Sequence, residues 1–144
     1  MCQLATEWID RAQNAEDIYD KFISAYIALN FLYNERNEHC ERDRMVNYLF
    51  DVTDCLKIDL PSAQIIDEYL KHPVVNMTPR ASKKNPPQKV SDKRSLFAAI
   101  YQVRCNLFHG NKTLGDTRDQ RLVAQGADVI IDILTKAKAD GRYF

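Results

Sequence analysis

The chain has few of the residues that build turn-rich or sheet-rich proteins. Only 4 of its 144 residues are Gly and 5 are Pro, so the tight turns that join many short strands have little to form them. The prolines lie at Pro61, Pro73 and between 79 and 87, which leaves long stretches free for helices. The apolar share of 45% and the charged share of 28% are those of a folded globular protein. We therefore expect one helical domain over residues 1–144.

Signatures of membrane, secreted, metal-binding and nucleotide-binding proteins are also missing. No run approaches the ~20 apolar residues of a membrane span, and residues 1–8 lack the basic start and apolar middle of a signal peptide. The sequence thus predicts a cytoplasmic protein without membrane contact. The 4 Cys form no CxxC pair and the 3 His are far apart, so neither a disulfide framework nor a metal is expected. The isolated Gly residues exclude a Gly-rich phosphate loop, and no Ser nucleophile elbow is present.

Charge is balanced overall but divided along the chain. Residues 1–70 carry 6 Lys/Arg against 14 Asp/Glu, and residues 71–144 carry 14 against 6. Three interpretations are open. The two halves attract each other between subunits, or the basic half attracts a polyanion. Alternatively, the division exists only along the sequence and the folded surface is evenly mixed.

Hydrophobic spacing predicts an all-α bundle of about five helices with one long irregular basic loop. The predicted helical segments are 15–36, 41–56, 61–70, a helix capped by Asp92 or Ser91 that ends at Gly110, and 117–138, with a short segment at 4–11. We expect the two longest, 15–36 and 117–138, to pack antiparallel. Residues 74–91 form the irregular loop, which is either an RNA-attracting arm or a plain solvated connection. Gly126 predicts close packing against another helix.

The stretch from Tyr101 to Lys112, YQVRCNLFHGNK, holds the residues best suited to chemistry. Arg104 falls in the last turns of a helix, and His109 precedes the helix-ending Gly110. Residues five apart are rotated by roughly 140°, so Arg104 shares a face with Phe108 rather than with His109. For Arg104 and His109 to meet, either the helix end is distorted or a second copy of the chain completes the site. The spacing therefore predicts a composite site in a dimer.

These residues resemble the signature of HEPN domains, which are all-helical domains with an Arg, four to six residues, and then a His. The matching run is Arg104-Cys-Asn-Leu-Phe-His109, followed by Gly110. The run from Tyr26 to Tyr33 is similar to the aromatic–Asn–Tyr pattern of an early HEPN helix, and the long final helix also fits. In many members a polar residue directly follows the Arg; here Cys105 stands there and Asn106 comes one later. The resemblance covers roughly residues 15 to 138.

The resemblance implies a metal-independent, homodimeric endoribonuclease that needs no cofactor. RNA supplies its own nucleophile, the 2′-OH beside the scissile phosphate. His109 would serve as general acid or base, because its free pKa of about 6.5 lies near working pH. Arg104 would bind the phosphate with its planar, permanently charged fork, and Asn106 would support the pair. Without this resemblance, the sequence favours His109 as a cap for the helix dipole over His109 as a catalytic group.

Further residues are candidates for RNA contact or for support of the site. The candidate RNA contacts are basic residues at or beyond the ends of the motif helix: Lys112, Lys83, Lys84 and Lys89. Asn30 either makes a local hydrogen bond or orients Arg104 or His109. Tyr101 either stacks on a base or packs within the bundle.

Two other functions are open. The first is a non-catalytic HEPN-like module that binds RNA or a protein through the same groove. The second, which the resemblance implies for many short HEPN proteins, is a toxin held silent by an antitoxin or other regulatory protein.

Overall fold

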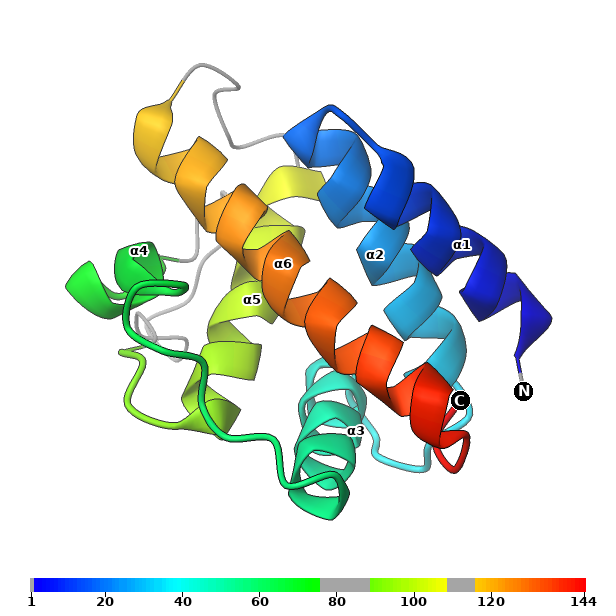
Figure 1. The fold of residues 1–144 in the computed structure, drawn as a ribbon. Helices are drawn as coiled ribbons and strands as arrows, with labels where there is room; N and C mark the ends of the chain where they lie inside the picture. Colours follow the sequence, from blue (N-terminus) through cyan, green and yellow to red (C-terminus); the bar gives the residue numbers. More distant parts are fainter. Residues whose placement is uncertain (1, 76–88, 109–115) are drawn as a thin grey trace.

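Six α-helices make up the described part of the chain in the computed structural model, which covers residues 2–75, 89–108 and 116–144 (Figure 1). The helices are α1 (Gln3–Asn14), α2 (Ile18–Tyr33), α3 (Glu41–Cys55), α4 (Asp67–Lys71), α5 (Lys93–Phe108) and α6 (Thr117–Asp140). The described residues contain no β-strand. The all-α prediction is confirmed.

The first two helices form a hairpin that follows directly from their sequences. In α1 the buried residues Ala5, Ile9 and Ala12 recur at steps of three and four, which places them on one face. Asp17 caps α2, since its carboxylate accepts hydrogen bonds from the N–H groups of Tyr19 and Asp20. The apolar face of α2 is wide because the helix packs on α1, α3 and α6 together, as the sequence predicted for so broad a stripe.

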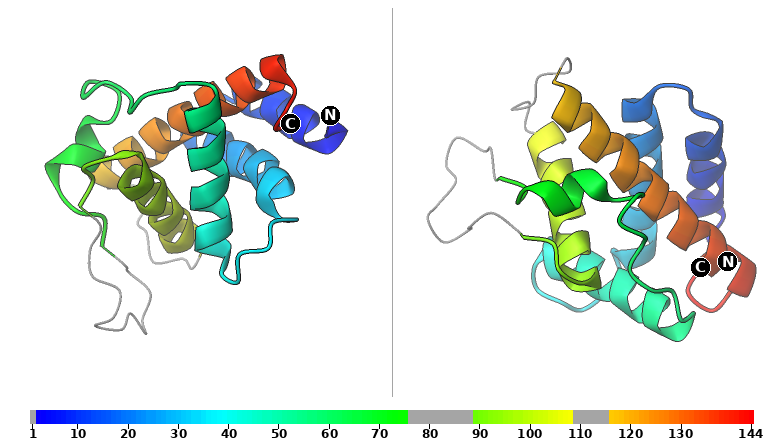
Figure 2. Two further views of the ribbon diagram at one scale, coloured as in Figure 1. Left: turned by 90° about the horizontal axis from the view of Figure 1, so that it is seen from below. Right: turned by 60° about the vertical axis from the view of Figure 1, so that its left-hand side comes forward.

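The predicted antiparallel packing of the two longest segments is wrong, because α6 runs parallel to α2 (Figure 1, Figure 2). Phe22 of α2 lies beside Gly126, and Tyr19, one turn earlier, lies near Asp119. Residue numbers thus rise together along both helices. The cause is α1, which runs antiparallel to both neighbours. Gln13 donates to Thr135 at 3.3 Å and Asp10 pairs with Lys138 at 3.8 Å, so residue numbers fall along α1 as they rise along α6.

The predicted start of the helix after Pro61 is also wrong. Residues 61–65 are not helical, and α4 begins only at Asp67 and ends before Pro73, as predicted for its end. Ile65 is 48% exposed, so this part of the chain has no buried face that would hold it in a helix.

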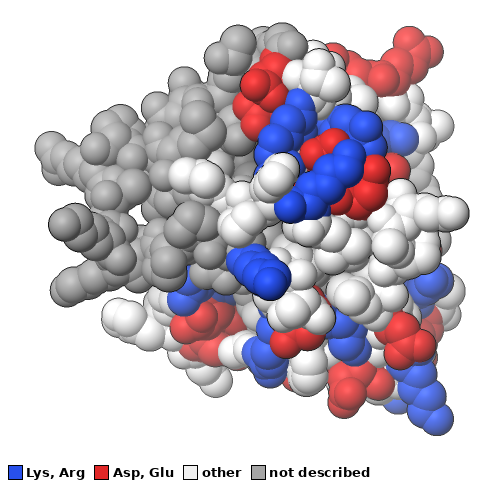
Figure 3. Space-filling view, turned by 90° about the vertical axis from the view of Figure 1, so that its left-hand side faces the viewer, with Lys and Arg blue, Asp and Glu red and all other residues white. Residues whose placement is uncertain are grey.

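Charges that are separated along the sequence meet in the fold. Asp67 accepts from Arg121 at 2.7 Å, and Glu68 accepts from Arg118 at 3.0 Å. These pairs join α4 to α6 and link the acidic half of the sequence to the basic half within one chain. On the described part of the molecular face drawn in Figure 3, Lys and Arg are interspersed with Asp and Glu. The interpretation of an evenly mixed surface therefore holds here.

Candidate functional site

The motif helix α5 starts at a polar cap that the sequence predicted. The Asp92 carboxylate accepts the Ser95 N–H at 2.8 Å, while the Ser95 hydroxyl accepts the N–H of Ser91 at 2.8 Å and of Asp92 at 3.0 Å. The Ser95 N–H bond lowers the pKa of Asp92. From this start, Leu96, Ile100 and Val103 are buried, which fixes the rotation of α5 and directs Arg104 toward α2 and α3.

Arg104 lies among three aromatic rings. Its guanidinium carbon is 5.0 Å from the ring centre of Phe108, 5.3 Å from that of Tyr26 and 5.9 Å from that of Tyr101. The contact with Phe108 confirms that these two residues share a helix face. The Arg104 side chain is 25% exposed, so one part of it is held by the rings and another reaches solvent. Rings in these positions attract a cation and hold its plane.

The polar groups of Arg104 are only partly used. Its Nη2 forms an ion pair with Glu41 at 3.6 Å, and its Nη1 lies 4.0 Å from the Cys105 sulfur. Its Nε is buried and has no hydrogen-bond partner among the described residues. Burial acts to lower the pKa of Arg104, but electrostatic interactions, among them that with the Glu41 carboxylate, outweigh this and leave the pKa above its ordinary value. The guanidinium therefore keeps its charge and has N–H donors to spare.

Glu41 is the centre of the site, and sequence reasoning missed it. Its Oε1 accepts from the Tyr33 hydroxyl at 2.7 Å and from Asn30 Nδ2 at 3.5 Å, and its Oε2 accepts from the Tyr101 hydroxyl at 3.5 Å. Helices α2, α3 and α5 thus converge on one carboxylate that also faces Arg104. A Glu in the first turn of a helix is favoured by the dipole alone, so the sequence carries no signal that marks this one.

Two tyrosine hydroxyls extend the cluster into the core. Tyr26 and Tyr33 are joined by a hydrogen bond of 2.9 Å, and both side chains are buried. Burial raises the pKa of Tyr33 to about 12 and raises the pKa of Tyr26 as well. Both phenols therefore stay protonated at neutral pH and act as neutral hydrogen-bonding groups.

This raised pKa predicts a loss of stability in alkali. An unfolded tyrosine ionises near pH ~10, whereas folded Tyr33 keeps its proton up to about pH 12. Between these values the unfolded state binds fewer protons, so the free energy of unfolding falls as pH rises. Denaturant unfolding from pH ~9 to ~11 is expected to show this fall, with a shallower slope in Tyr33→Phe. Equal slopes in the two proteins would contradict the assignment.

The structure brings two of the predicted supporting residues to Arg104. Asn30 makes both the local hydrogen bond, to the Tyr33 hydroxyl at 2.9 Å, and the bond to Glu41 that connects it to Arg104. Tyr101 is half-buried; it packs beside Arg104 and also bonds Glu41. For Asn30 the local hydrogen bond and the link to the Arg104 cluster therefore coexist. For Tyr101 the packing within the bundle is confirmed, and stacking on a base stays a prediction.

Asn106 lies elsewhere. It is fully buried, its Nδ2 donates to the Val75 carbonyl at 2.8 Å, and its Oδ1 accepts from Gln102 at 2.9 Å. Two residues along a helix are rotated by roughly 200°, so Asn106 points away from the face of Arg104. Its described contacts give it the role of fixing the chain at Val75 rather than of orienting Arg104.

The remaining predicted site residues have no described place in the cluster. Lys89 is described and exposed. The others lie outside the described ranges, namely His109, Lys112, Lys83 and Lys84, with most of the basic loop. The meeting of Arg104 and His109 thus stays a prediction, because His109 lies beyond the described end of α5.

Comparisons with known proteins leave these observations to stand alone. No protein-family model, no curated protein sequence and no solved structure matches the chain. Over the described ranges, no three or more His, Cys, Asp or Glu side chains gather in a way that would hold a metal ion. None of the described helices has the length and apolar character needed to span a membrane.

Proposed function

We propose that the Arg104 cluster is the phosphate-binding half of a metal-independent endoribonuclease of HEPN type. One observation carries the proposal: a charged, largely buried guanidinium has its Nε without a hydrogen-bond partner among the described residues. Arg has five N–H donors, and a buried donor left unpaired costs free energy. A phosphate arriving at Arg104 would supply acceptors for the free donors, in the paired geometry that this side chain favours.

The reaction follows from the chemistry of RNA. The 2′-oxygen attacks phosphorus, the bond from phosphorus to the 5′-oxygen breaks, and a proton passes to the leaving 5′-oxygen. Arg104 stabilises the negative charge that builds on the phosphoryl oxygens, and His109 moves the protons. The products are a 2′,3′-cyclic phosphate and a 5′-hydroxyl. No step requires a metal or another cofactor.

A homodimer belongs to this proposal because Arg104 and His109 cannot share one face of a regular helix. Two large apolar side chains are exposed on the helices that carry the cluster, Phe31 at 40% on α2 and Phe108 at 48% on α5. The exposed Phe108 ring lies beside the Arg104 cation, and such a ring also suits stacking with unpaired bases. Single-stranded RNA is therefore the proposed substrate class.

The test is cleavage of labelled single-stranded RNA in EDTA. Wild type should leave a 2′,3′-cyclic phosphate, and His109→Ala should lose activity by about a hundredfold or more, the size expected for a general acid or base. His72→Ala is the matched control, because His72 is exposed and follows α4, which is not one of the helices that carry the cluster. Mixing Arg104→Ala with His109→Ala chains should restore part of the activity if one site uses two subunits. Full activity in folded His109→Ala would refute the proposal.

One observation favours a second function, that of a non-catalytic module binding RNA or a protein. Arg104 is already paired with Glu41 and enclosed by rings, as an arginine that holds helices together would be. The module should bind RNA with an affinity that falls as salt rises and release no product. Such binding, with Arg104→Ala weakening it, would replace the enzymatic proposal.

A further inference from the structure

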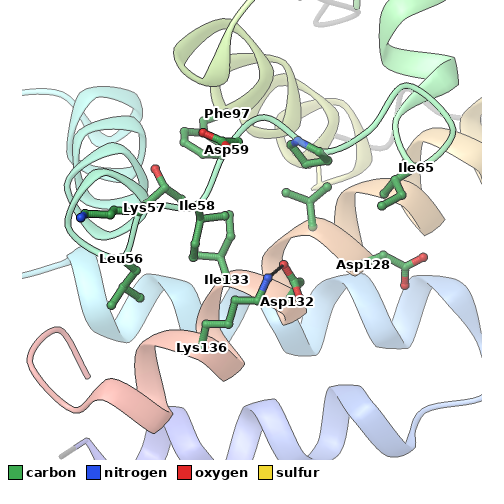
Figure 4. A pocket seen from close by; sticks show the side chains of 13 residues that line it. Leu56, Lys57, Ile58, Asp59, Ile65, Phe97, Asp128, Asp132, Ile133 and Lys136 are labelled. Carbon is green, nitrogen blue, oxygen red and sulfur yellow. Dashed lines mark hydrogen bonds and ion pairs between the residues drawn. The ribbon is translucent and has the colours of Figure 1, made fainter.

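A cavity lies apart from the Arg104 cluster and is lined by residues of α3, α5, α6 and the segment that follows α3. It has a volume of about 670 Å³ and opens between the segment 56–65 and the second half of α6, with Phe97 of α5 at its inner end (Figure 4). This volume is within the range of roughly 300–1,000 Å³ typical of small-molecule sites. None of Arg104, Glu41 or their hydrogen-bonding partners lines it.

The wall formed by segment 56–65 is anchored, so the cavity is built before any ligand arrives. The N–H of Ile58 donates to the Thr53 carbonyl at 2.8 Å, and Lys93 Nζ donates to the Ile58 carbonyl at 3.1 Å. Lys57 between them has a φ of 54°, a left-handed conformation that turns the chain out of α3. Ile66, just beyond the segment, is fully buried and fixes its other end.

Apolar side chains form most of the lining. Phe97, Val129 and Ile133 provide the floor, with little exposure of their own. Ile65 lines the outer wall and is 48% exposed. Covering half-exposed apolar surface with an apolar group is favourable, because it removes that surface from water. Preformed cavities of this kind bind the apolar body of a ligand, and a few polar groups in the lining determine which ligand is selected.

The charged side chains around the cavity determine the sign of the charge that a bound ligand should carry. Asp132 is neutralised by Lys136 at 2.9 Å, as the dashed line in Figure 4 shows. Asp128 lies one turn earlier on α6 and has no ion pair or hydrogen bond with another described residue. Lys57 lies at the other end of the cavity from Asp128 (Figure 4). The end of the cavity beside Asp128 therefore carries an uncompensated negative charge.

We infer that this cavity binds a small amphipathic cation, with an apolar or aromatic body against Phe97, Ile65 and Ile133 and a protonated amine at Asp128. The apolar lining and the cavity volume set the size and body of the ligand. Asp128 sets its charge. The site is separate from the proposed ribonuclease site, so either can fail without the other.

The experiment compares three probes that share one body and differ in charge: phenylbutylamine, phenylbutanol and phenylbutyrate. Each is titrated into the isotope-labelled full chain and followed by amide chemical shifts. The amine is expected to shift resonances of segment 57–65 and of residues 128–136, and to bind about twofold to fivefold more tightly than the alcohol, the size of an exposed ion pair. The butyrate should bind most weakly, and added salt should narrow the differences.

Two substitutions at exposed positions separate the two parts of the site without threatening the fold. Asp128→Asn should lower the affinity of the amine to that of the alcohol and leave the alcohol unchanged, whereas Asp54→Asn, on α3 and outside the cavity, should change neither. Ile65→Ala should weaken all three probes alike. Equal affinities for the three probes, shifts located elsewhere, or no saturable shift would each overturn the inference.

Discussion

Replacing Arg104 with alanine is expected to lower the rate of RNA cleavage by about a hundredfold to a thousandfold, the usual effect of removing one charge-stabilising group from an active site. The guanidinium is the only described Arg or Lys group in the cluster, and its N–H groups that lack a partner among the described residues are the donors proposed to meet the phosphate. The loss should appear in kcat as well as KM, because charge builds on the phosphoryl oxygens mainly in the transition state. Single-turnover cleavage measures it.

Folding must be measured beside activity, because Arg104 also touches three rings and Glu41. Losing these contacts is expected to lower the free energy of unfolding by about 1 kcal/mol, since the ion pair is partly exposed and each ring contact is weak. Arg104→Lys keeps the charge but lacks the planar fork. Relative to Arg104→Ala, it should therefore restore more of the free energy of unfolding than of the cleavage rate. Denaturant unfolding of all three proteins gives the comparison.

The matched control for this substitution is Arg94→Ala. Arg94 lies on the same helix, and its guanidinium also covers an aromatic ring, that of Phe50 at 4.0 Å. It is exposed and donates to Asn47 at 2.7 Å. Its removal changes the net charge equally but should leave cleavage near the wild-type rate. If both variants lost cleavage alike, general charge and not the Arg104 site would explain the effect.

The helices could be predicted because their signals are local. Asp92 caps α5 through a residue three positions later, and the buried faces of α3 and α6 repeat at steps of three and four. These features depend on neighbours along the chain, which a sequence displays. The sharing of a face by Arg104 and Phe108 was predictable for the same reason.

The direction of packing and the centre of the site could not be predicted, because both depend on residues far apart in sequence. The predicted segments 15–36 and 117–138 became α2 and α6. Nothing in their sequences indicates that α1 packs antiparallel to each of them, which makes α2 and α6 parallel to each other. Glu41 meets Arg104 across 63 positions, and its own surroundings in the sequence are those of an ordinary first-turn Glu. Asn106 was assigned to the site by closeness along the chain, although its rotation on α5 turns it toward Val75.

Gly126 in the middle of α6 leads to the second large effect, on stability. A Cβ built at this position would lie 2.6 Å from the Tyr69 hydroxyl and 3.1 Å from a ring carbon of Phe22. The Tyr69 hydroxyl is held in place by its hydrogen bond to the Leu122 carbonyl at 2.7 Å. The helix therefore approaches α2 and α4 closely only because residue 126 has no side chain, which confirms the close packing predicted for this glycine.

Gly126→Ala is expected to lower the free energy of unfolding by about 1–3 kcal/mol, the usual cost of overpacking a core. This loss comes despite the gain of roughly 1 kcal/mol that alanine brings to an exposed helix position. Thermal and denaturant unfolding measure the change. Gly141→Ala is the contrasting control: its Cβ would meet no atom within 4 Å, and its cost comes only from a backbone φ of 87°.

A double substitution identifies the atom responsible for the clash. Tyr69→Phe removes the hydroxyl that lies nearest to the new Cβ, at a cost of about 1 kcal/mol for the lost hydrogen bond. In that background Gly126→Ala should cost less than it does alone, with an interaction free energy of roughly 1–2 kcal/mol. Gly141→Ala should cost the same in both backgrounds. Strict additivity of Gly126→Ala and Tyr69→Phe would show that Phe22 or the helix backbone, and not the tyrosine hydroxyl, sets the distance between α6 and its neighbours.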